Sequence, residues 1–139
     1  MLVTNQLQFQ YSTHRTFTFP NIQCEKGEKL LLLGASGVGK TTLLHLLGGL
    51  LRPTQGEVSI NGQNLAALKG THLDHFRGRN IGIIFQQPHF LRALTVSENL
   101  ILAQQLAGLK VDKPLIYSFL DNLNMGHQRD VKTDRLSVG

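Results

Sequence analysis

A segment of mostly small residues, Gly34 to Thr41, interrupts the most apolar stretch of the chain. Its sequence, GASGVGKT, matches the pattern G-x-x-x-x-G-K-[ST] and lies between two leucine-rich segments. Residues without bulky side chains let successive backbone N–H groups turn toward phosphate oxygens, and the start of a helix adds further unpaired N–H groups. The pattern therefore predicts a loop that binds the polyphosphate of a nucleotide.

Two side chains of this loop predict the chemistry at the polyphosphate. Lys40 would reach the β- and γ-phosphates, and the Thr41 hydroxyl would be a ligand of Mg²⁺. The alternative interpretation is a glycine-rich turn with an incidental lysine, which the apolar segments on both sides disfavour. We therefore predict that the chain binds a nucleotide with magnesium.

A strand before the loop and a helix after it must hold the loop in place. The continuous apolar run Lys29 to Leu33 favours a strand that is covered on both faces. From Thr42 the leucines form a wide helical stripe, which predicts a helix that is buried on most sides and stops at residues 52–54. A second apolar run, Ile81 to Phe85, predicts another buried strand.

Shorter patterns predict antiparallel strands around this core. Residues Val3 to Tyr11 and Thr16 to Phe19 nearly alternate between apolar and polar types, which is typical of half-buried strands. Residues 25–28 read as a turn. Residues 57–60 and 63–65 read as a hairpin, because the intervening Asn61-Gly62 supplies the positive φ angles of a tight turn.

The character of the chain changes to helices after residue 86. Thr95 and Glu98 have the spacing of a capping box, which predicts a helix that starts at Val96 and stops at Gly108. Asp112 can cap a second helix that runs to about residue 123. This second helix would place three apolar side chains on one face, namely Leu115, Phe119 and Leu123.

Composition excludes several classes of protein. The 139 residues are 41% hydrophobic and 17% charged, which is ordinary for one globular domain. The basic residues that give the net charge of +5 are scattered along the chain, so we expect no nucleic-acid partner.

The cysteine and histidine residues exclude two further kinds of site. Cys24 is the single cysteine, so an internal disulfide is excluded. His72 and His75 lack a third metal ligand of suitable spacing. No apolar run reaches the ~18 residues of a membrane span.

Three longer strings resemble the ATP-binding subunit of an ABC transporter. They are GASGVGKTTLLHLLGGLLRPTQGEVSINGQNL, IGIIFQQPHFLRALTVSENL and the final RLSVG, so the resemblance covers nearly the whole chain. The segment HLLGGL and the basic residues before residue 81 are most similar to those of the lipoprotein-releasing and macrolide-export branch of this family.

The resemblance implies roles for further residues. Gln86 matches the Q-loop glutamine, which contacts Mg²⁺ and the attacking water and senses the transmembrane subunit. Tyr11 resembles the aromatic residue that stacks on adenine, and Thr42 resembles a second loop hydroxyl near the α-phosphate. Ser137 and Gly139 resemble the start of the signature motif, which binds the γ-phosphate of an ATP held by the other subunit.

The complete set of site residues combines the loop with these matches. The catalytic residues would be Lys40 and Gln86, and the Mg²⁺ ligands Thr41 and Gln86. The ATP-binding residues would be Tyr11, Gly34, Ala35, Ser36, Gly37, Val38, Gly39, Lys40, Thr41, Thr42, Ser137 and Gly139.

Each match has a simpler alternative. Gln86 could merely end a strand, Tyr11 could be an ordinary core aromatic, and Ser137 could be a helix N-cap, a role that is compatible with nucleotide binding. Val138 departs from the glycine that is usual in the signature motif, which puts close approach of the backbone to phosphate in doubt at that position.

The resemblance also implies the fold class, α/β. The chain would be one truncated P-loop NTPase domain of the ABC ATPase type, with residues 1–88 as the nucleotide-binding core and its antiparallel β subdomain. Residues 89–139 would begin an α-helical subdomain. The acidic pair that should follow the signature is missing, and residues 116–121 do not replace it because their apolar spacing is helical. We therefore expect an incomplete parallel sheet and the N-terminal part of a longer protein, cut inside the signature.

The expected function follows from the same resemblance. The complete protein would hydrolyse ATP as a head-to-tail dimer on transmembrane permease subunits, at the cytoplasmic face of the cell membrane, whereas this chain alone would be inactive. An ABC-type ATPase that acts on nucleic acid or ribosomes is the alternative, but the short spacing from Gln86 to the signature leaves no room for an inserted domain. A P-loop kinase or GTPase is disfavoured by the strings IGIIFQQ and RLSVG.

Overall fold

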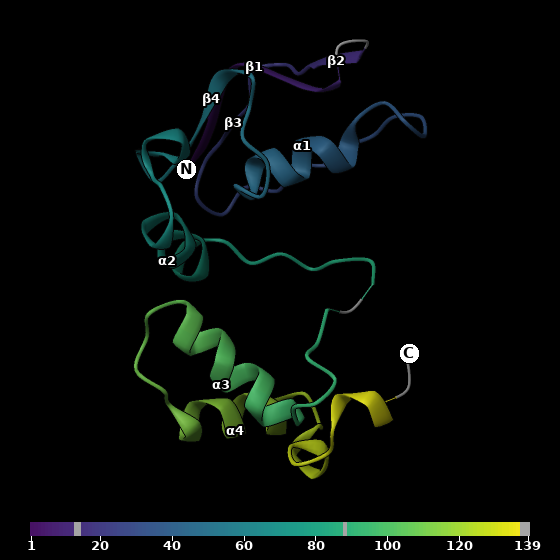
Figure 1. The fold of residues 1–139 in the computed structure, drawn as a ribbon, viewed down its shortest axis with the longest axis vertical. Coiled ribbons are helices and arrows are strands. Elements are labelled where there is room, and N and C mark those ends of the chain that lie inside the picture. The colour runs from purple at the N-terminus through teal and green to yellow at the C-terminus, as the bar shows by residue number, and fades with distance from the viewer. Residues whose placement is uncertain (13–14, 88, 137–139) are drawn as a thin grey trace. The chain divides into compact units, whose positions relative to one another are not determined.

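The computed structural model describes residues 1–12, 15–87 and 89–136 (Figure 1). The chain divides into two compact units, Met1–Leu73 and Asp74–Gly139, which are described separately below. The expected division into residues 1–88 and 89–139 stays a prediction.

An antiparallel sheet dominates the first unit. Its strands pair in the order β2-β1-β4-β5, and β3 also pairs with β1. The strands are β1 (Leu2–Ser12), β2 (Arg15–Thr18), β3 (Gln23–Cys24), β4 (Gln55–Ile60) and β5 (Gln63–Asn64). The predicted antiparallel strands and the turn at Asn61-Gly62 are thus confirmed, with φ angles of 51° and 79° at the two turn residues.

A β-bulge in β1 decides which of its side chains enter the core. Asn5 pairs with Glu57, but Gln8 pairs with Gln55, so Gln6 and Leu7 together lie opposite Gly56. The extra residue shifts the alternation by one position. Thr4 is buried before the bulge, and Leu7 and Phe9 are buried after it. A strictly alternating strand would have turned Leu7 toward solvent.

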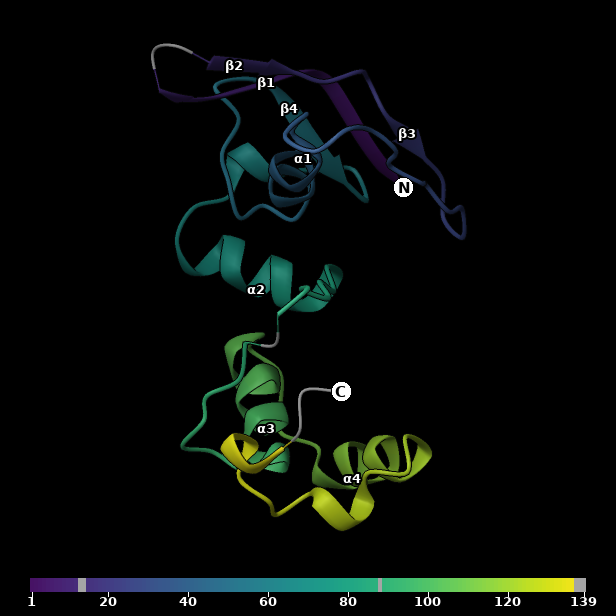
Figure 2. The same cartoon turned by 90° about the vertical axis from the view of Figure 1, so that its right-hand side faces the viewer.

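Helix α1 (Lys40–Leu47) follows the small-residue loop and lies against the sheet in both ribbon views (Figures 1 and 2). Leu43 and Leu46 are buried, whereas Leu44 is exposed, so the apolar contact is narrower than the leucine stripe predicts. The helix also ends earlier than predicted. Gly48 donates its backbone N–H to the carbonyl oxygen of Leu44, and Gly49 donates to that of Leu46, so the helix ends ahead of the expected stop at residues 52–54.

The two predicted buried strands, residues 29–33 and 81–85, are wrong for this structure. Neither run forms a strand among the described residues, and most of their side chains are exposed, with Leu33 at 82% and Ile84 at 101%. All strand pairs of the described residues are antiparallel, so the expected incomplete parallel sheet is absent from this part of the chain. An apolar run indicates that a segment favours burial, but a strand also needs a neighbouring strand to which its backbone can hydrogen-bond.

Helices make up the second unit, together with the 3-10 turns η2 (Gly126–Gln128) and η3 (Thr133–Arg135). Its α-helices include α3 (Val96–Leu106) and α4 (Lys113–Asn122), and both predicted N-caps are confirmed. Val96 of α3 and Ile116 and Leu120 of α4 form the buried cluster. The predicted apolar face of Leu115, Phe119 and Leu123 is exposed.

The sequence patterns missed helix α2 (Thr71–Asn80), which begins in the first unit, as well as the 3-10 turn η1 (Leu65–Ala67). No residue of α2 is buried, so it lacks the apolar stripe by which helices are recognised. Arg79 nevertheless fixes its second half in place. Its guanidinium donates to the carbonyl oxygens of Ala107 and Gly108, at 3.0 and 2.8 Å, and so caps the end of α3.

The capping box of α3 makes part of the stability depend on pH. The Thr95 backbone N–H donates to the Glu98 carboxylate at 2.8 Å, and the Glu98 N–H donates to the Thr95 hydroxyl at 3.2 Å. The bond from the Thr95 backbone lowers the pKa of Glu98 below its ordinary value of 4.5. A carboxyl with a lowered pKa stabilises the fold above its unfolded-state pKa, and the gain is lost as pH falls through the lowered value.

We expect Glu98→Gln to remove this contribution to acid sensitivity. Glutamine can keep the capping hydrogen bond but does not titrate. The melting temperature of the native protein should therefore fall more between pH 6 and pH 3 than that of the variant. Equal falls would show that the capping carboxylate contributes nothing to acid sensitivity.

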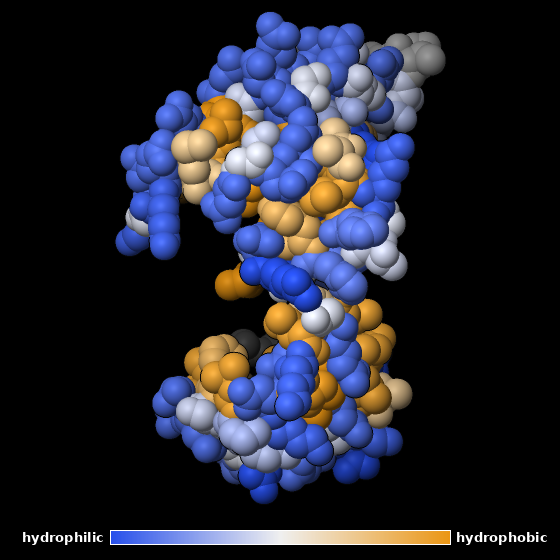
Figure 3. Space-filling model, turned by 90° about the vertical axis from the view of Figure 1, so that its left-hand side faces the viewer, coloured by the Kyte–Doolittle hydropathy of each residue, from blue (hydrophilic) through white to orange (hydrophobic). Residues whose placement is uncertain are grey.

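Apolar side chains reach the surface in both units (Figure 3). Phe90 and Leu91 are exposed in the segment that follows residue 88. Within the described residues, no helix has the length and apolar content needed to cross a bilayer.

Candidate nucleotide site

The small-residue loop reaches helix α1 through a left-handed glycine. Gly39 is the N-cap of α1 and has φ of 105°. A Cβ atom at this position would lie 2.7 Å from the ring of Phe17, so only glycine fits between the loop and strand β2. The first backbone N–H groups of α1 are therefore placed at the end of the loop, where an anion can accept from them.

Lys40 folds back across this loop. Its ammonium donates to the carbonyl oxygens of Gly34 and Ala35, at 2.7 and 2.8 Å. Both contacts are to neutral backbone groups, so the positive charge of Lys40 is not cancelled by a carboxylate. The loop is thus held in shape by the same cation that a phosphate group would attract.

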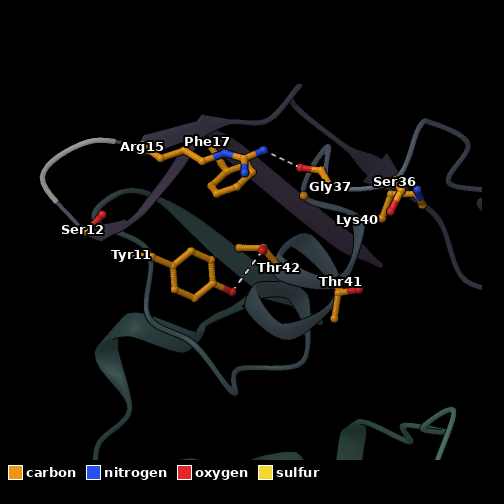
Figure 4. Close-up of a pocket in the computed structure, with 10 residues that line it drawn as sticks. Tyr11, Ser12, Arg15, Phe17, Ser36, Gly37, Lys40, Thr41 and Thr42 are labelled. Atoms are coloured by element: carbon orange, nitrogen blue, oxygen red, sulfur yellow. Dashed lines mark hydrogen bonds between the residues drawn. The ribbon is translucent and has the colours of Figure 1, made fainter.

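Tyr11 and Thr42 connect the aromatic side of the site to α1. Their hydroxyl groups are 3.1 Å apart and hydrogen-bonded (Figure 4). Tyr11 is 60% exposed and packs its ring edge to face with Phe9, at 4.7 Å between centroids. The alternative interpretation of Tyr11 as a core residue is therefore wrong, and its ring is accessible to a ligand. Thr42 is buried, so its hydroxyl faces Tyr11 more than solvent.

One pocket of about 620 Å³ contains Tyr11, Lys40 and Thr42 in its lining. Pockets of this size hold small molecules and cofactors. The pocket is lined by Tyr11, Ser12, Arg15, Phe17, Ser36, Gly37, Gly39, Lys40, Thr41 and Thr42. Two cations and no carboxylate belong to this lining among the described residues, so the site suits an anion with a flat apolar group.

The same lining fits Mg²⁺ only together with a phosphate ligand. Mg²⁺ prefers oxygen ligands and is commonly bound through one or two protein groups plus phosphate oxygens and water. The Thr41 hydroxyl supplies one such oxygen. No group of three His, Cys, Asp or Glu residues that could hold a metal occurs in the described ranges.

Strand β2 contributes two residues that sequence reasoning missed, Arg15 and Phe17. The Arg15 guanidinium donates to the Gly37 carbonyl oxygen at 2.6 Å and lies 4.6 Å from the centre of the Phe17 ring. The alternation of β2 could have placed both side chains on one face of the strand, but the register of the hairpin is needed to place them beside the loop. Phe9 pairs with Phe17 and Ser12 pairs with Arg15, so the hairpin carries these side chains toward the loop.

Some of the predicted site residues are not brought to this pocket. Gln86 is exposed at a bend in the second unit and is not part of the pocket lining. Ser137 and Gly139, the expected signature residues, lie outside the described residues. Gly34, Ala35 and Val38 belong to the loop without lining the pocket. The roles of all these residues stay predictions.

Comparison with known proteins agrees with the resemblance seen in the sequence. A family model described as "ABC transporter" matches residues 18–139. The lipoprotein-releasing system ATP-binding protein LolD of Xanthomonas oryzae pv. oryzae is 39% identical over 115 residues, which are 81% of this chain and 47% of that protein. LolD of Xylella fastidiosa is 39% identical over 121 residues, 86% of this chain and 50% of that protein. The chain spans about half the length of these curated relatives.

Solved structures show the same relationship. A dimeric post-hydrolysis state of an ATP-binding cassette bound to ADP and Pi matches with a TM-score of 0.83 and 27% identity, over 99% of this chain and 63% of the other. An ATP-binding subunit of an ABC transporter matches with a TM-score of 0.80 and 25% identity, over 98% of this chain and 55% of the other. The α/β class expected from the sequence is thereby confirmed. The chain belongs to the ABC transporter family and folds as part of its ATP-binding cassette.

Proposed function

We propose that this chain is the nucleotide-binding part of an ABC transporter subunit and that it binds ATP with Mg²⁺. The observation that carries the proposal is the position of Lys40, whose ammonium spans the loop and bonds only to backbone carbonyl oxygens of Gly34 and Ala35 in the described contacts. A cation held in this way can contact phosphate oxygens without first breaking an ion pair.

Each part of ATP has residues that suit it. The loop amides and the start of α1 would receive the phosphates, and Lys40 would contact the β- and γ-phosphates. The exposed ring of Tyr11 would stack on adenine. The Thr41 hydroxyl would hold Mg²⁺, and the metal would neutralise charge on the phosphate oxygens.

We propose hydrolysis and transport for the complete protein. Gln86 would orient the attacking water, and Ser137 and Gly139 would complete the site of a second copy in a head-to-tail dimer. Transmembrane permease subunits would be the partners that hold the protein at the cytoplasmic face of the membrane, with the exposed Phe90 and Leu91 among the contacts. The names of the relatives support a transport role in the lipoprotein-releasing branch and do not favour the nucleic-acid alternative.

Calorimetric titration of the complete protein tests this proposal. We expect heat of binding with ATP and magnesium, much weaker binding of adenosine, and co-purification with a membrane protein. The absence of ATP binding by a folded protein would reject the nucleotide site. Binding of ATP together with co-purification of nucleic acid in place of a membrane protein would reject the transport role.

A further inference from the structure

Arg15 is the second cation of the nucleotide pocket, and the proposed function assigns it no role. It reaches from strand β2 to the small-residue loop, and Figure 4 shows its guanidinium beside Gly37. The bond to the Gly37 carbonyl oxygen, at 2.6 Å, fixes one end of the side chain. The ring of Phe17, 4.6 Å from the guanidinium carbon, supports it from another side.

The contacts of Arg15 leave most of its binding capacity unused. A guanidinium carries five N–H donors in a rigid plane, and the described residues provide an acceptor for one of them, on Gly37. The ion pairs seen in the described part of the chain, Arg77–Asp74 and Arg129–Asp130, do not involve Arg15. A positioned arginine without a carboxylate partner, in the wall of a pocket, suits an oxyanion that can accept two parallel hydrogen bonds.

We propose that Arg15 is a further nucleotide-binding residue that contacts the polyphosphate of ATP. This inference rests on the proposed function, because it assigns a ligand to the same pocket. Lys40, on α1, presents a compact ammonium group, whereas Arg15, on β2, presents a planar guanidinium, whose fork of N–H groups can form two parallel hydrogen bonds. The hydrogen bond to Gly37 keeps the fork next to the loop, so the pocket binds phosphate from two elements of the fold.

Arg15→Gln tests the inference in the complete protein. Charge-assisted hydrogen bonds are worth about a factor of ten in affinity, so we expect about tenfold weaker binding of ATP and of inorganic tripolyphosphate. Adenosine, which has no phosphate, should bind within about twofold of the native affinity. Arg15→Lys keeps the charge and loses the fork, so its affinity for tripolyphosphate should lie between those of the native protein and Arg15→Gln.

Arg52→Gln is the matched control. Arg52 also donates to a backbone carbonyl oxygen in the first unit, that of Leu68 at 3.2 Å, but does not line the nucleotide pocket. Its variant loses the same charge and a similar contact, and should bind tripolyphosphate as the native protein does. Melting temperatures of all variants would show that each is folded.

Salt distinguishes a phosphate contact from a purely structural clamp on the loop. Screening weakens the attraction between separate charges, so the difference between native protein and Arg15→Gln should shrink as ionic strength rises. A loss of affinity that is equal at low and high salt would mean that Arg15 only holds the loop in shape, and would overturn the inference.

Two further outcomes separate this inference from the proposed function. If Arg15→Gln binds ATP with the native affinity, the inference is overturned, but ATP binding by the native protein leaves the proposed function standing. Failure of the native protein to bind ATP would reject both.

Discussion

Replacing Lys40 by alanine is expected to weaken Mg-ATP binding by the complete protein about 100-fold or more. Hydrogen bonds to charged groups contribute about 1.5–3 kcal/mol each, and 1.4 kcal/mol is a factor of ten in affinity. The ammonium can form more than one such bond with adjacent phosphates. The variant also loses the two hydrogen bonds from Lys40 to the loop, to the carbonyl oxygens of Gly34 and Ala35.

Calorimetry and phosphate release measure this effect. Lys29→Ala is the matched control, because Lys29 is exposed in the same unit and does not line the pocket. It should bind ATP like the native protein. An affinity of Lys40→Ala within about threefold of the native value, with an unchanged fold, would contradict the assignment of the loop as the phosphate site.

Gly56→Ala is expected to produce the largest loss of stability, about 3–5 kcal/mol. Gly56 has φ of 76°, and a Cβ atom there would lie 2.3 Å from the backbone oxygens of Asn5 and Gln6. A left-handed conformation costs a non-glycine residue about 1–3 kcal/mol. The clash with two backbone oxygens adds to this cost, because relief requires β1 and β4 to separate at the bulge.

Gly62→Ala isolates the contribution of the clash. Gly62 has a similar φ of 79°, but nothing lies within 4 Å of a Cβ built there. This control should therefore lose only about 1 kcal/mol, the cost of the strained backbone. Chemical unfolding of the complete protein, followed by a probe of the first unit, gives both values. Equal losses in the two variants would mean that the bulge relaxes at no cost.

Features of the fold that depend on nearby residues could be predicted from the sequence. The capping box joins Thr95 and Glu98, and the turn at Asn61-Gly62 depends on two adjacent residues. In each case the donor and acceptor, or the required backbone angle, belong to a few consecutive positions. The small-residue loop before α1 belongs to the same class.

Features that depend on distant partners could not be predicted. Leucines 30, 31 and 33 favour burial, but whether they form a strand depends on hydrogen bonds to another segment, which no local pattern specifies. Helix α2 was missed because it is held by Arg79 at the end of α3 and not by an apolar stripe. The burial of Leu7 depends on the bulge opposite Gly56, which the alternation of β1 alone does not reveal.

The candidate site divides in the same way. The loop with Lys40, Thr41 and Thr42 could be predicted because these residues are consecutive in the sequence. Arg15, in contrast, is brought to the pocket by the register of the β1–β2 hairpin. Ser12 pairs with Arg15 across that hairpin, and this register is a property of the folded chain.

The carbonyl contacts of Lys40 also have a kinetic consequence. In the described contacts its ammonium is held by the dipoles of Gly34 and Ala35, with no carboxylate to displace. An arriving anion therefore has no carboxylate to displace from Lys40, and the positive charge attracts it. We therefore expect an anion to enter this pocket quickly, because the lysine has no ion pair to break first.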